Sequence, residues 1–267
     1  MALAKAGEIE LSYDRAGEGP PLLLIMGMSG TKHHWGESLL EALRRDFETI
    51  VYDHRDAGDS TRTGRPFTIV DLAEDATGLL AALDIDSAHV MGISMGGMIA
   101  QELALAHADR LRSLTLGCTY CGGEGSVLAS EDVMRKLAEA MSSGDRERAI
   151  RASWEANVSP SFAADEQAWA RFLATGMRYG LPVEVIMRQM QAISGHDTSA
   201  RLPSIEVPTQ VVHGTLDQLL PVHNGSMIAE LIPDSRLEIF EGVGHMFFLE
   251  KPERVAELLC EHDSLHV

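Results

Sequence analysis

Short apolar runs that alternate with longer helical patterns constrain the fold of this chain more than any other feature. Six runs of five or six residues are bounded by Gly, Pro or Asp, as expected of strands that are buried on both faces. They cover residues 21–26, 47–52, 88–93, 111–116, 208–213 and 236–240. Helical patterns lie between them at 35–45, 68–83, 95–107, 223–232 and 252–262. This alternation predicts an α/β domain with a mostly parallel sheet and helices on both faces.

Two segments depart from the alternation. Near residues 8–14, apolar and polar side chains alternate, which is typical of an antiparallel hairpin at a sheet edge. Between residues 119 and 204 no strand pattern occurs, and helices are predicted at 130–143, 145–156, 165–178 and 182–194. We therefore divide the chain into a core, residues 1–118 and 205–267, and an all-helical insertion, residues 119–204. Such an insertion would cover the carboxyl ends of the strands, where α/β sheets bind ligands.

The charge balance excludes several classes of partner. The chain carries 22 Lys and Arg against 40 Asp and Glu, a formal net charge of −18. This disfavours binding to nucleic-acid phosphates and to anionic membranes. No apolar run approaches the ~18 residues of a membrane helix, and the N-terminus lacks the apolar core of a signal peptide. We therefore expect a cytoplasmic protein that binds neither nucleic acid nor membrane.

The three cysteines are too few for a disulfide framework. Cys118 and Cys121 form a C-x-x-C, which is a redox motif in other settings. The pair does not open a helix after a first strand–helix unit. Two small buried residues at a strand end are therefore the simpler interpretation.

The sequence Gly92-Ile-Ser94-Met-Gly96 is a G-x-S-x-G in the setting that a catalytic serine requires. It follows the predicted strand 88–93 and precedes the predicted helix 95–107, so Ser94 would lie at the strand–turn–helix corner called a nucleophile elbow. The glycines suit that turn, because side chains beside a strained serine would clash with neighbouring backbone. The alternative is that Ser94 caps an ordinary helix.

A serine hydroxyl is a poor nucleophile and needs a histidine that is held by an acid. His245 lies directly after the last predicted strand, and Asp217 lies just after the strand before it. Both loops would reach the carboxyl edge of the sheet, in the chain order Ser94, Asp217, His245. The alternatives are a helix cap for Asp217 and a surface loop position for His245. His213 also follows a strand near this edge, with a satisfied core histidine as the simpler interpretation.

Several motifs in this order resemble the α/β-hydrolase superfamily over essentially the whole chain. They are the segment 25–28 after the first long strand, the segment 53–60 after the next, the elbow 92–97, the Asp217 and His245 loops, and the segment 244–252. Among subgroups, the chain is similar to bacterial carboxylesterases, methylesterases, enol-lactonases and cofactor-free haloperoxidase or perhydrolase-like members. The resemblance implies an α/β-hydrolase fold with eight strands, in which residues 119–204 form a helical cap.

The resemblance also implies an oxyanion hole and a substrate pocket. Its donors would be the backbone N–H groups of Met28 and Met95. The chain departs from the family at Met26, where histidine is usual, and at Asp56, where glycine is common; we predict only a structural role for Asp56. The predicted pocket comprises Met26, Gly27, Trp154, Met177, Met187, Leu219 and Met246. The aromatic residues of the insertion have the alternative role of forming its own core.

The predicted function is hydrolysis of a carboxylic ester or lactone of a small to medium apolar substrate, through an acyl-enzyme on Ser94. Alternatives on the same triad are a cofactor-free perhydrolase or haloperoxidase and a carbon–carbon bond hydrolase. A non-catalytic small-molecule receptor is a further alternative. No phosphate-binding glycine motif occurs, and His33-His34 lacks further metal ligands, so we expect neither cofactor nor metal. The small-molecule substrate is the one expected partner, and a homodimer is left open.

Overall fold

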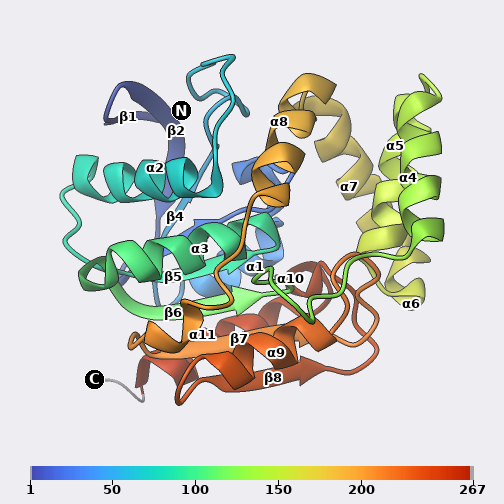
Figure 1. Ribbon diagram of the computed structural model, residues 1–267. Helices are drawn as coiled ribbons and strands as arrows, with labels where there is room; N and C mark the ends of the chain where they lie inside the picture. Colours follow the sequence, from blue (N-terminus) through green and yellow to red (C-terminus); the bar gives the residue numbers. More distant parts are fainter. Residues whose placement is uncertain (1, 265–267) are drawn as a thin grey trace.

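An eight-stranded β-sheet forms the centre of the protein, whose computed structural model describes residues 2–264 (Figure 1). The strands lie in the order β1-β2-β4-β3-β5-β6-β7-β8. Their bounds are β1 (Ala2–Ala6), β2 (Ile9–Ala16), β3 (Pro21–Ile25), β4 (Glu48–Tyr52), β5 (Ala88–Ile93), β6 (Leu111–Gly117), β7 (Thr209–Gly214) and β8 (Arg236–Phe240). β2 pairs antiparallel with β1 and β4, and the other neighbours are parallel. The prediction of a mostly parallel sheet with eight strands is therefore confirmed.

The two faces of the sheet are covered by separate apolar layers. Along β3, Leu23 and Ile25 join one layer while Leu22 and Leu24 join the other, because successive side chains of a strand point to opposite faces. In β5 every residue is buried. Burial on both faces explains why the central strands occur in the sequence as unbroken apolar runs.

Helices pack on both layers. The first layer is covered by α2 (Ile69–Ala82), α3 (Met95–Ala106) and α9 (His223–Leu231), and the second by α1 (Glu37–Leu43), α10 (Phe247–Glu250) and α11 (Pro252–Ser264). Helix α2 begins where the sequence predicts, since the Thr68 hydroxyl accepts the Asp71 N–H and the Asp71 side chain accepts the Thr68 N–H. Short 3₁₀ helices occur at η1 (Lys32–His34), η2 (Ala108–Arg110) and η3 (Leu202–Ser204).

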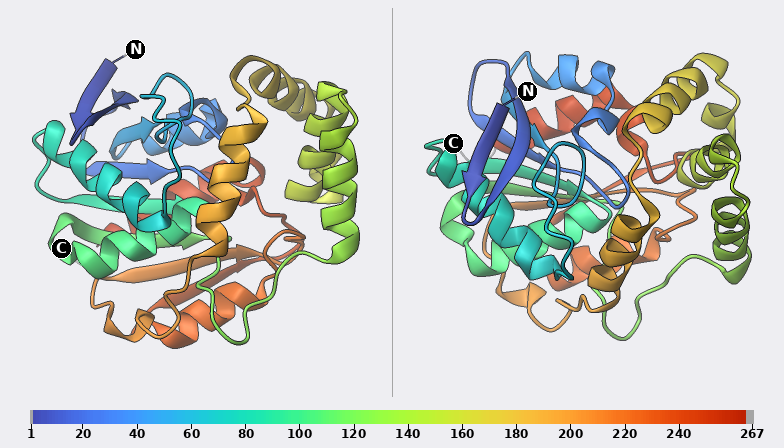
Figure 2. Two further views of the ribbon diagram at one scale, coloured as in Figure 1. Left: turned by 45° about the horizontal axis from the view of Figure 1, so that its top comes forward. Right: turned by 90° about the horizontal axis from the view of Figure 1, so that it is seen from above.

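Five helices lie between β6 and β7 in the chain. They are α4 (Glu131–Ser142), α5 (Arg146–Asn157), α6 (Pro160–Ala163), α7 (Glu166–Tyr179) and α8 (Val183–Ser194). The sequence predicts four of them and misses α6, which has four residues and is too short for a helical period. Its local signal is Ser159 as the cap and Pro160 at the first position. Figures 1 and 2 show these helices on one side of the sheet, toward which the arrows of β5 and β6 point.

The inserted helices have a small apolar core of their own. Trp154 is 1% exposed, and its ring contacts Phe162 and Phe172 at centroid distances of 5.5 and 4.9 Å. Met246 packs against this cluster and also against the second layer of the sheet. The division of the chain into a core and a cap stays a prediction. No helix within residues 2–264 is both long enough and apolar enough to span a membrane.

Candidate active site

Ser94 lies at a strained corner between β5 and α3. Its φ of 54° and ψ of −123° fall outside the regions that a serine ordinarily adopts. The corner is held by hydrogen bonds from Ser94 N to Gly117 O at 2.9 Å and from the Thr119 hydroxyl to Ser94 O at 2.7 Å. A Cβ at Gly96 would lie 2.0 Å from the Ile25 carbonyl oxygen, so only glycine fits there. This geometry is that of the predicted elbow.

Asp217 and His245 meet in the loops that follow β7 and β8. Nδ1 of His245 lies 2.6 Å from Oδ2 of Asp217, and both residues are buried. The other carboxylate oxygen, Oδ1, accepts the N–H groups of Leu219 and Leu220, each at 2.9 Å. The backbone of its own loop thus holds Asp217 in place. Since Asp217 binds Nδ1 of His245, Nε2 of His245 is available for other hydrogen bonds.

The electrostatics keep Asp217 ionised. Burial raises the pKa of Asp217, but the charge of His245 and the hydrogen bonds of His213 and His245 outweigh burial and hold the pKa well below its ordinary value. A carboxylate that stays charged in a buried position can orient a histidine and stabilise its protonated form.

His213 is a second histidine on Asp217. Its Nε2 lies 2.7 Å from the Leu220 carbonyl oxygen and 3.2 Å from Oδ2 of Asp217, and its side chain is fully buried. Because the Leu220 carbonyl can only accept, Nε2 carries the proton. His213 therefore has a hydrogen bond at Nε2, but its buried Nδ1 has no hydrogen-bond partner among the described residues. The expected satisfied core histidine is thus satisfied at one ring nitrogen only, and His213 also lies at the candidate site.

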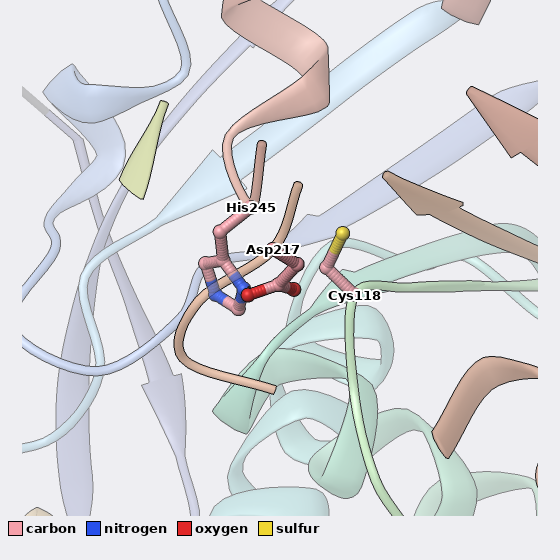
Figure 3. A group of neighbouring side chains, drawn as sticks. All are labelled: Cys118, Asp217 and His245. Carbon is pink, nitrogen blue, oxygen red and sulfur yellow. The ribbon is translucent and has the colours of Figure 1, made fainter. Parts of the chain in front are cut away.

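Cys118 is the third member of this cluster (Figure 3). Among the described residues, Cys118, Asp217 and His245 form the one group of His, Cys, Asp and Glu side chains close enough to share an ion, with one ligand atom from each within 4.8 Å. Burial and the charge of Asp217 raise the pKa of the Cys118 thiol well above its usual range. A metal needs the thiolate, and the Asp217–His245 hydrogen bond already occupies two ligand atoms, so the arrangement favours hydrogen bonding over a metal site.

The loop that carries Met28 lies against the nucleophile corner. A Cβ at Gly27 would be 3.0 Å from Cβ and 3.6 Å from Oγ of Ser94. Gly30 N donates to Gly27 O at 3.3 Å and closes a turn, while the Met26 carbonyl accepts Nε2–H of His54 at 2.8 Å. Met95 is the first residue of α3, where a backbone N–H has no partner within the helix. Gly27, the residue before Met28, thus lies against Ser94, and Met95 directly follows Ser94 in the chain. The assignment of the Met28 and Met95 N–H groups to an oxyanion hole stays a prediction.

The predicted pocket residues occupy different environments. Met26 and Trp154 are 3% and 1% exposed and belong to apolar clusters, whereas Met177 and Met187 are 46% and 55% exposed. Leu219 and Met246 are half-buried. Trp154 has the core role that the sequence left as an alternative. The assignment of these side chains to a substrate pocket stays a prediction.

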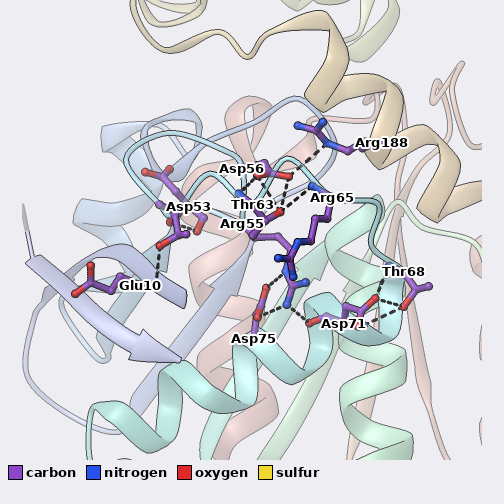
Figure 4. A network of polar contacts seen from close by, with 12 residues as sticks. Glu10, Asp53, Arg55, Asp56, Thr63, Arg65, Thr68, Asp71, Asp75 and Arg188 are labelled. Carbon is purple, nitrogen blue, oxygen red and sulfur yellow. Dashed lines mark hydrogen bonds and ion pairs between the residues drawn. The ribbon is translucent and has the colours of Figure 1, made fainter. Parts of the chain in front are cut away.

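A separate cavity of about 540 Å³ opens between the β1–β2 turn and α2. Arg55, Arg65, Asp71 and Asp75 are among its lining residues, and none of the lining residues belongs to the predicted active site. Nε and Nη2 of Arg55 donate to the Asp75 carboxylate at 2.6 and 2.7 Å (Figure 4). This bidentate pair ties the loop after β4 to α2 and has a structural role.

Asp56 joins the same loop to the inserted helices. Its carboxylate accepts the Thr63 hydroxyl at 3.1 Å and the Gly64 N–H at 3.0 Å, and it lies 3.4 Å from Nε of Arg188 on α8 (Figure 4). The φ of Asp56 is 65°, which explains why glycine is an acceptable residue at this position. The structural role predicted for Asp56 thus includes a contact with α8 that the sequence did not indicate.

Sequence reasoning also missed Gln189, whose side chain accepts the N–H of Ser29 at 2.9 Å. A single glutamine in an amphipathic helix gives no signal that it contacts a loop 160 residues away. For His213, the spacing of four residues to Asp217 after a strand was the available signal.

Comparisons with known proteins agree with the fold. The model of the alpha/beta hydrolase fold family matches residues 20–252. A provisionally named carbamate hydrolase, RutD of Azorhizobium caulinodans, is 31% identical over 260 residues, which is 97% of either chain. The structure of a hydrolase from Pseudomonas aeruginosa PA01 is 27% identical, with a TM-score of 0.83 and 97% of each chain covered. That of Est816, an N-acyl homoserine lactone degrading enzyme, is 27% identical, with a TM-score of 0.81 and coverage of 97% of this chain and 99% of that one.

Proposed function

The chain belongs to the alpha/beta hydrolase fold family, and on this premise we propose that it is a serine hydrolase that cleaves carboxylic esters or lactones. The observation that carries the proposal is a serine at a strained strand–helix corner in the same fold as a buried Asp217–His245 pair joined at 2.6 Å. A nucleophile, a base and an acid that orients the base are the parts that acyl transfer needs.

Each group has a step in the reaction. Oγ of Ser94 attacks the carbonyl carbon while Nε2 of His245 takes the hydroxyl proton. The negative charge that develops on the carbonyl oxygen is stabilised by the N–H groups of Met28 and Met95. His245 then gives its proton to the leaving alcohol, and an acyl-enzyme remains on Ser94. Water, deprotonated by His245, attacks the ester of the acyl-enzyme, and the carboxylic acid leaves as His245 returns that proton to Oγ of Ser94.

Met28, whose side chain is 38% exposed, favours an apolar acyl group of small to medium size, because Met adapts to irregular shapes. Met26 and Met95 are buried in the two apolar layers of the sheet. A carbamate is the second candidate substrate, since the relative with 31% identity is provisionally named for that activity. A carbamate carbonyl needs the same nucleophile and the same oxyanion donors as an ester.

Two measurements on the purified chain test the proposal. A fluorophosphonate probe should label the wild type at Ser94, and a series of p-nitrophenyl esters, simple lactones and an aryl carbamate should show which acyl class turns over. Ser94→Ala should lower kcat on the order of 10⁶-fold, the usual cost of losing a triad nucleophile. Ser142→Ala, which changes an exposed serine on α4, is the matched control and should leave kcat unchanged.

The outcomes separate the alternatives. Turnover by Ser94→Ala within tenfold of the wild type would refute the triad. Labelling of Ser94 without turnover of any substrate would favour a small-molecule receptor. Oxidation of bromide by acetate and peroxide, or turnover of dienoate substrates with weak turnover of esters, would favour the perhydrolase or the carbon–carbon hydrolase.

A further inference from the structure

A glutamine of the inserted helices reaches the loop that carries the proposed oxyanion donor Met28. Gln189 lies on α8 and is fully buried. Its Oε1 accepts the backbone N–H of Ser29, the residue after Met28, at 2.9 Å. Helix α8 therefore contacts the loop directly through a side chain.

This hydrogen bond restrains the backbone on the C-terminal side of Met28. The peptide group between Met28 and Ser29 is planar, so holding the Ser29 N–H also sets the orientation of the Met28 carbonyl. Ser29 has a φ of 65°, in the left-handed region that a serine rarely adopts without support. The turn is otherwise closed by the hydrogen bond of 3.3 Å from Gly30 N to Gly27 O. Gln189 thus supports the unusual backbone conformation that follows the oxyanion donor.

The second atom of the amide indicates that this contact does not serve stability alone. Because the Ser29 N–H is a donor, the amide oxygen of Gln189 must face it. Turning the amide over would place the NH₂ group against this N–H, so no orientation of the side chain gives both amide atoms a partner. Nε2 is buried and has no hydrogen-bond partner among the residues that the structure describes. An unpaired buried donor is unfavourable, so its cost offsets part of the stability that the hydrogen bond to Ser29 contributes.

The neighbouring residue anchors the same stretch of α8. Nε of Arg188 lies 3.4 Å from the carboxylate of Asp56, which is itself held by the Thr63 hydroxyl (Figure 4). Two successive residues of one helix thus contact two separate loops of the sheet domain. This double contact restrains where Gln189 can place its oxygen.

We propose that Gln189 is a positioning residue for the oxyanion hole, which holds the turn that carries Met28 by its hydrogen bond to the next residue, Ser29. The proposal rests on the proposed function. Removing the hydrogen bond frees the backbone at Ser29, which is partly exposed, so the turn from Gly27 to Gly30 can relax. Relaxation of this turn displaces Met28, and with it the N–H of the preceding peptide that faces the developing oxyanion. The effect falls on the transition state more than on substrate binding, because the oxyanion forms only during the reaction.

The test compares Gln189→Met with Gln191→Met, which makes the same change at an exposed position of α8. For Gln189→Met we expect kcat for p-nitrophenyl esters to fall about 10- to 100-fold with KM within about threefold. Affinity for an alkylboronic acid, which mimics the tetrahedral intermediate, should weaken by a similar factor. The melting temperature should change by only a few degrees, because removing the unpaired Nε2 donor offsets part of the loss of the hydrogen bond to the partly exposed Ser29. Gln191→Met should match the wild type in all of these measurements.

Two results would overturn the proposal. One is a kcat for Gln189→Met within twofold of that for Gln191→Met. The other is a loss of activity that accompanies an equal loss of folded protein, which would assign Gln189 a structural role only. Ser94→Ala separates a failure of the proposed function from a failure of the role inferred for Gln189. If it stays active, the proposed function fails and this inference fails with it; if it is inactive while Gln189→Met is fully active, only the inference fails.

Discussion

Replacing Gly27 by alanine tests whether the Met28 loop packs against the nucleophile as the structure has it. Gly27 does not adopt a φ that favours glycine, so an alanine there brings no backbone strain of its own. Its Cβ would lie 3.0 Å from Cβ of Ser94 and 3.3 Å from the carbonyl oxygen of Ile93. The substitution therefore acts through a single added methyl group beside the proposed nucleophile.

The size of the effect follows from these distances. Carbon atoms in contact are about 3.5–4.0 Å apart, so either Ser94 or the loop must move by about 0.5–1 Å. A misplacement of about 1 Å at a reacting centre can reduce the rate about 10²-fold. We expect Gly27→Ala to lower kcat/KM about 10- to 100-fold. Inserting a methyl group into a packed site should also cost about 1–3 kcal/mol of unfolding free energy, which leaves a folded protein.

The assay is hydrolysis of p-nitrophenyl butyrate, together with the rate of fluorophosphonate labelling and urea unfolding of the same preparation. Gly195→Ala is the matched control, since the nearest atom to its Cβ would be 3.7 Å away. It should retain wild-type activity. If Gly27→Ala is folded and both its hydrolysis and its labelling stay within twofold of the wild type, the packing of this loop against Ser94 is refuted.

Three further predictions follow from buried polar groups. Asp217→Asn should lower kcat about 10⁴-fold, because an amide N–H facing His245 forces the imidazole into the wrong tautomer; a pH–rate profile measures this. Asp75→Asn should reduce the free energy of unfolding in urea by about 1–2 kcal/mol, since an amide can accept only one of the two hydrogen bonds from Arg55, while kcat stays unchanged. Burial lowers the pKa of both His34 and His196 to about 4, so the unfolded chain binds their protons first and stability should fall as the pH drops from about 6.5 to 4. His196→Gln should reduce that fall in urea titrations by the share of one histidine.

The residues that belong to the sheet could be predicted because their signals are local. The elbow motif specifies Ser94 through the glycines around it, and the ends of two neighbouring parallel strands must bring Asp217 and His245 to one edge of the sheet. The apolar runs predicted the central strands for the same reason, because a strand buried on both faces has an unbroken apolar sequence. Short elements such as α6 have no period and were missed.

The contacts of the inserted helices could not be predicted, because they join residues that no local pattern connects. Gln189 contacts Ser29, Arg188 contacts Asp56, and the ring of Tyr179 stacks on His33 at a centroid distance of 3.8 Å. Each of these contacts depends on how α7 and α8 lie over the loops after β3 and β4, which is a property of tertiary packing.

Through these contacts, substitutions in α8 can affect the candidate active site. The proposed reacting groups, Ser94, Asp217 and His245, lie on the sheet and its loops, whereas a hydrogen bond from α8 restrains the residue after Met28. Substitutions that shift α8 should therefore alter catalytic efficiency even where they touch neither the nucleophile nor the base. A shift of α8 changes the position of Gln189 and Arg188 together, since they are adjacent in one helix. On these proposals, the helices between β6 and β7 tune the oxyanion hole, so that catalytic efficiency depends on how α8 packs against the loop after β3.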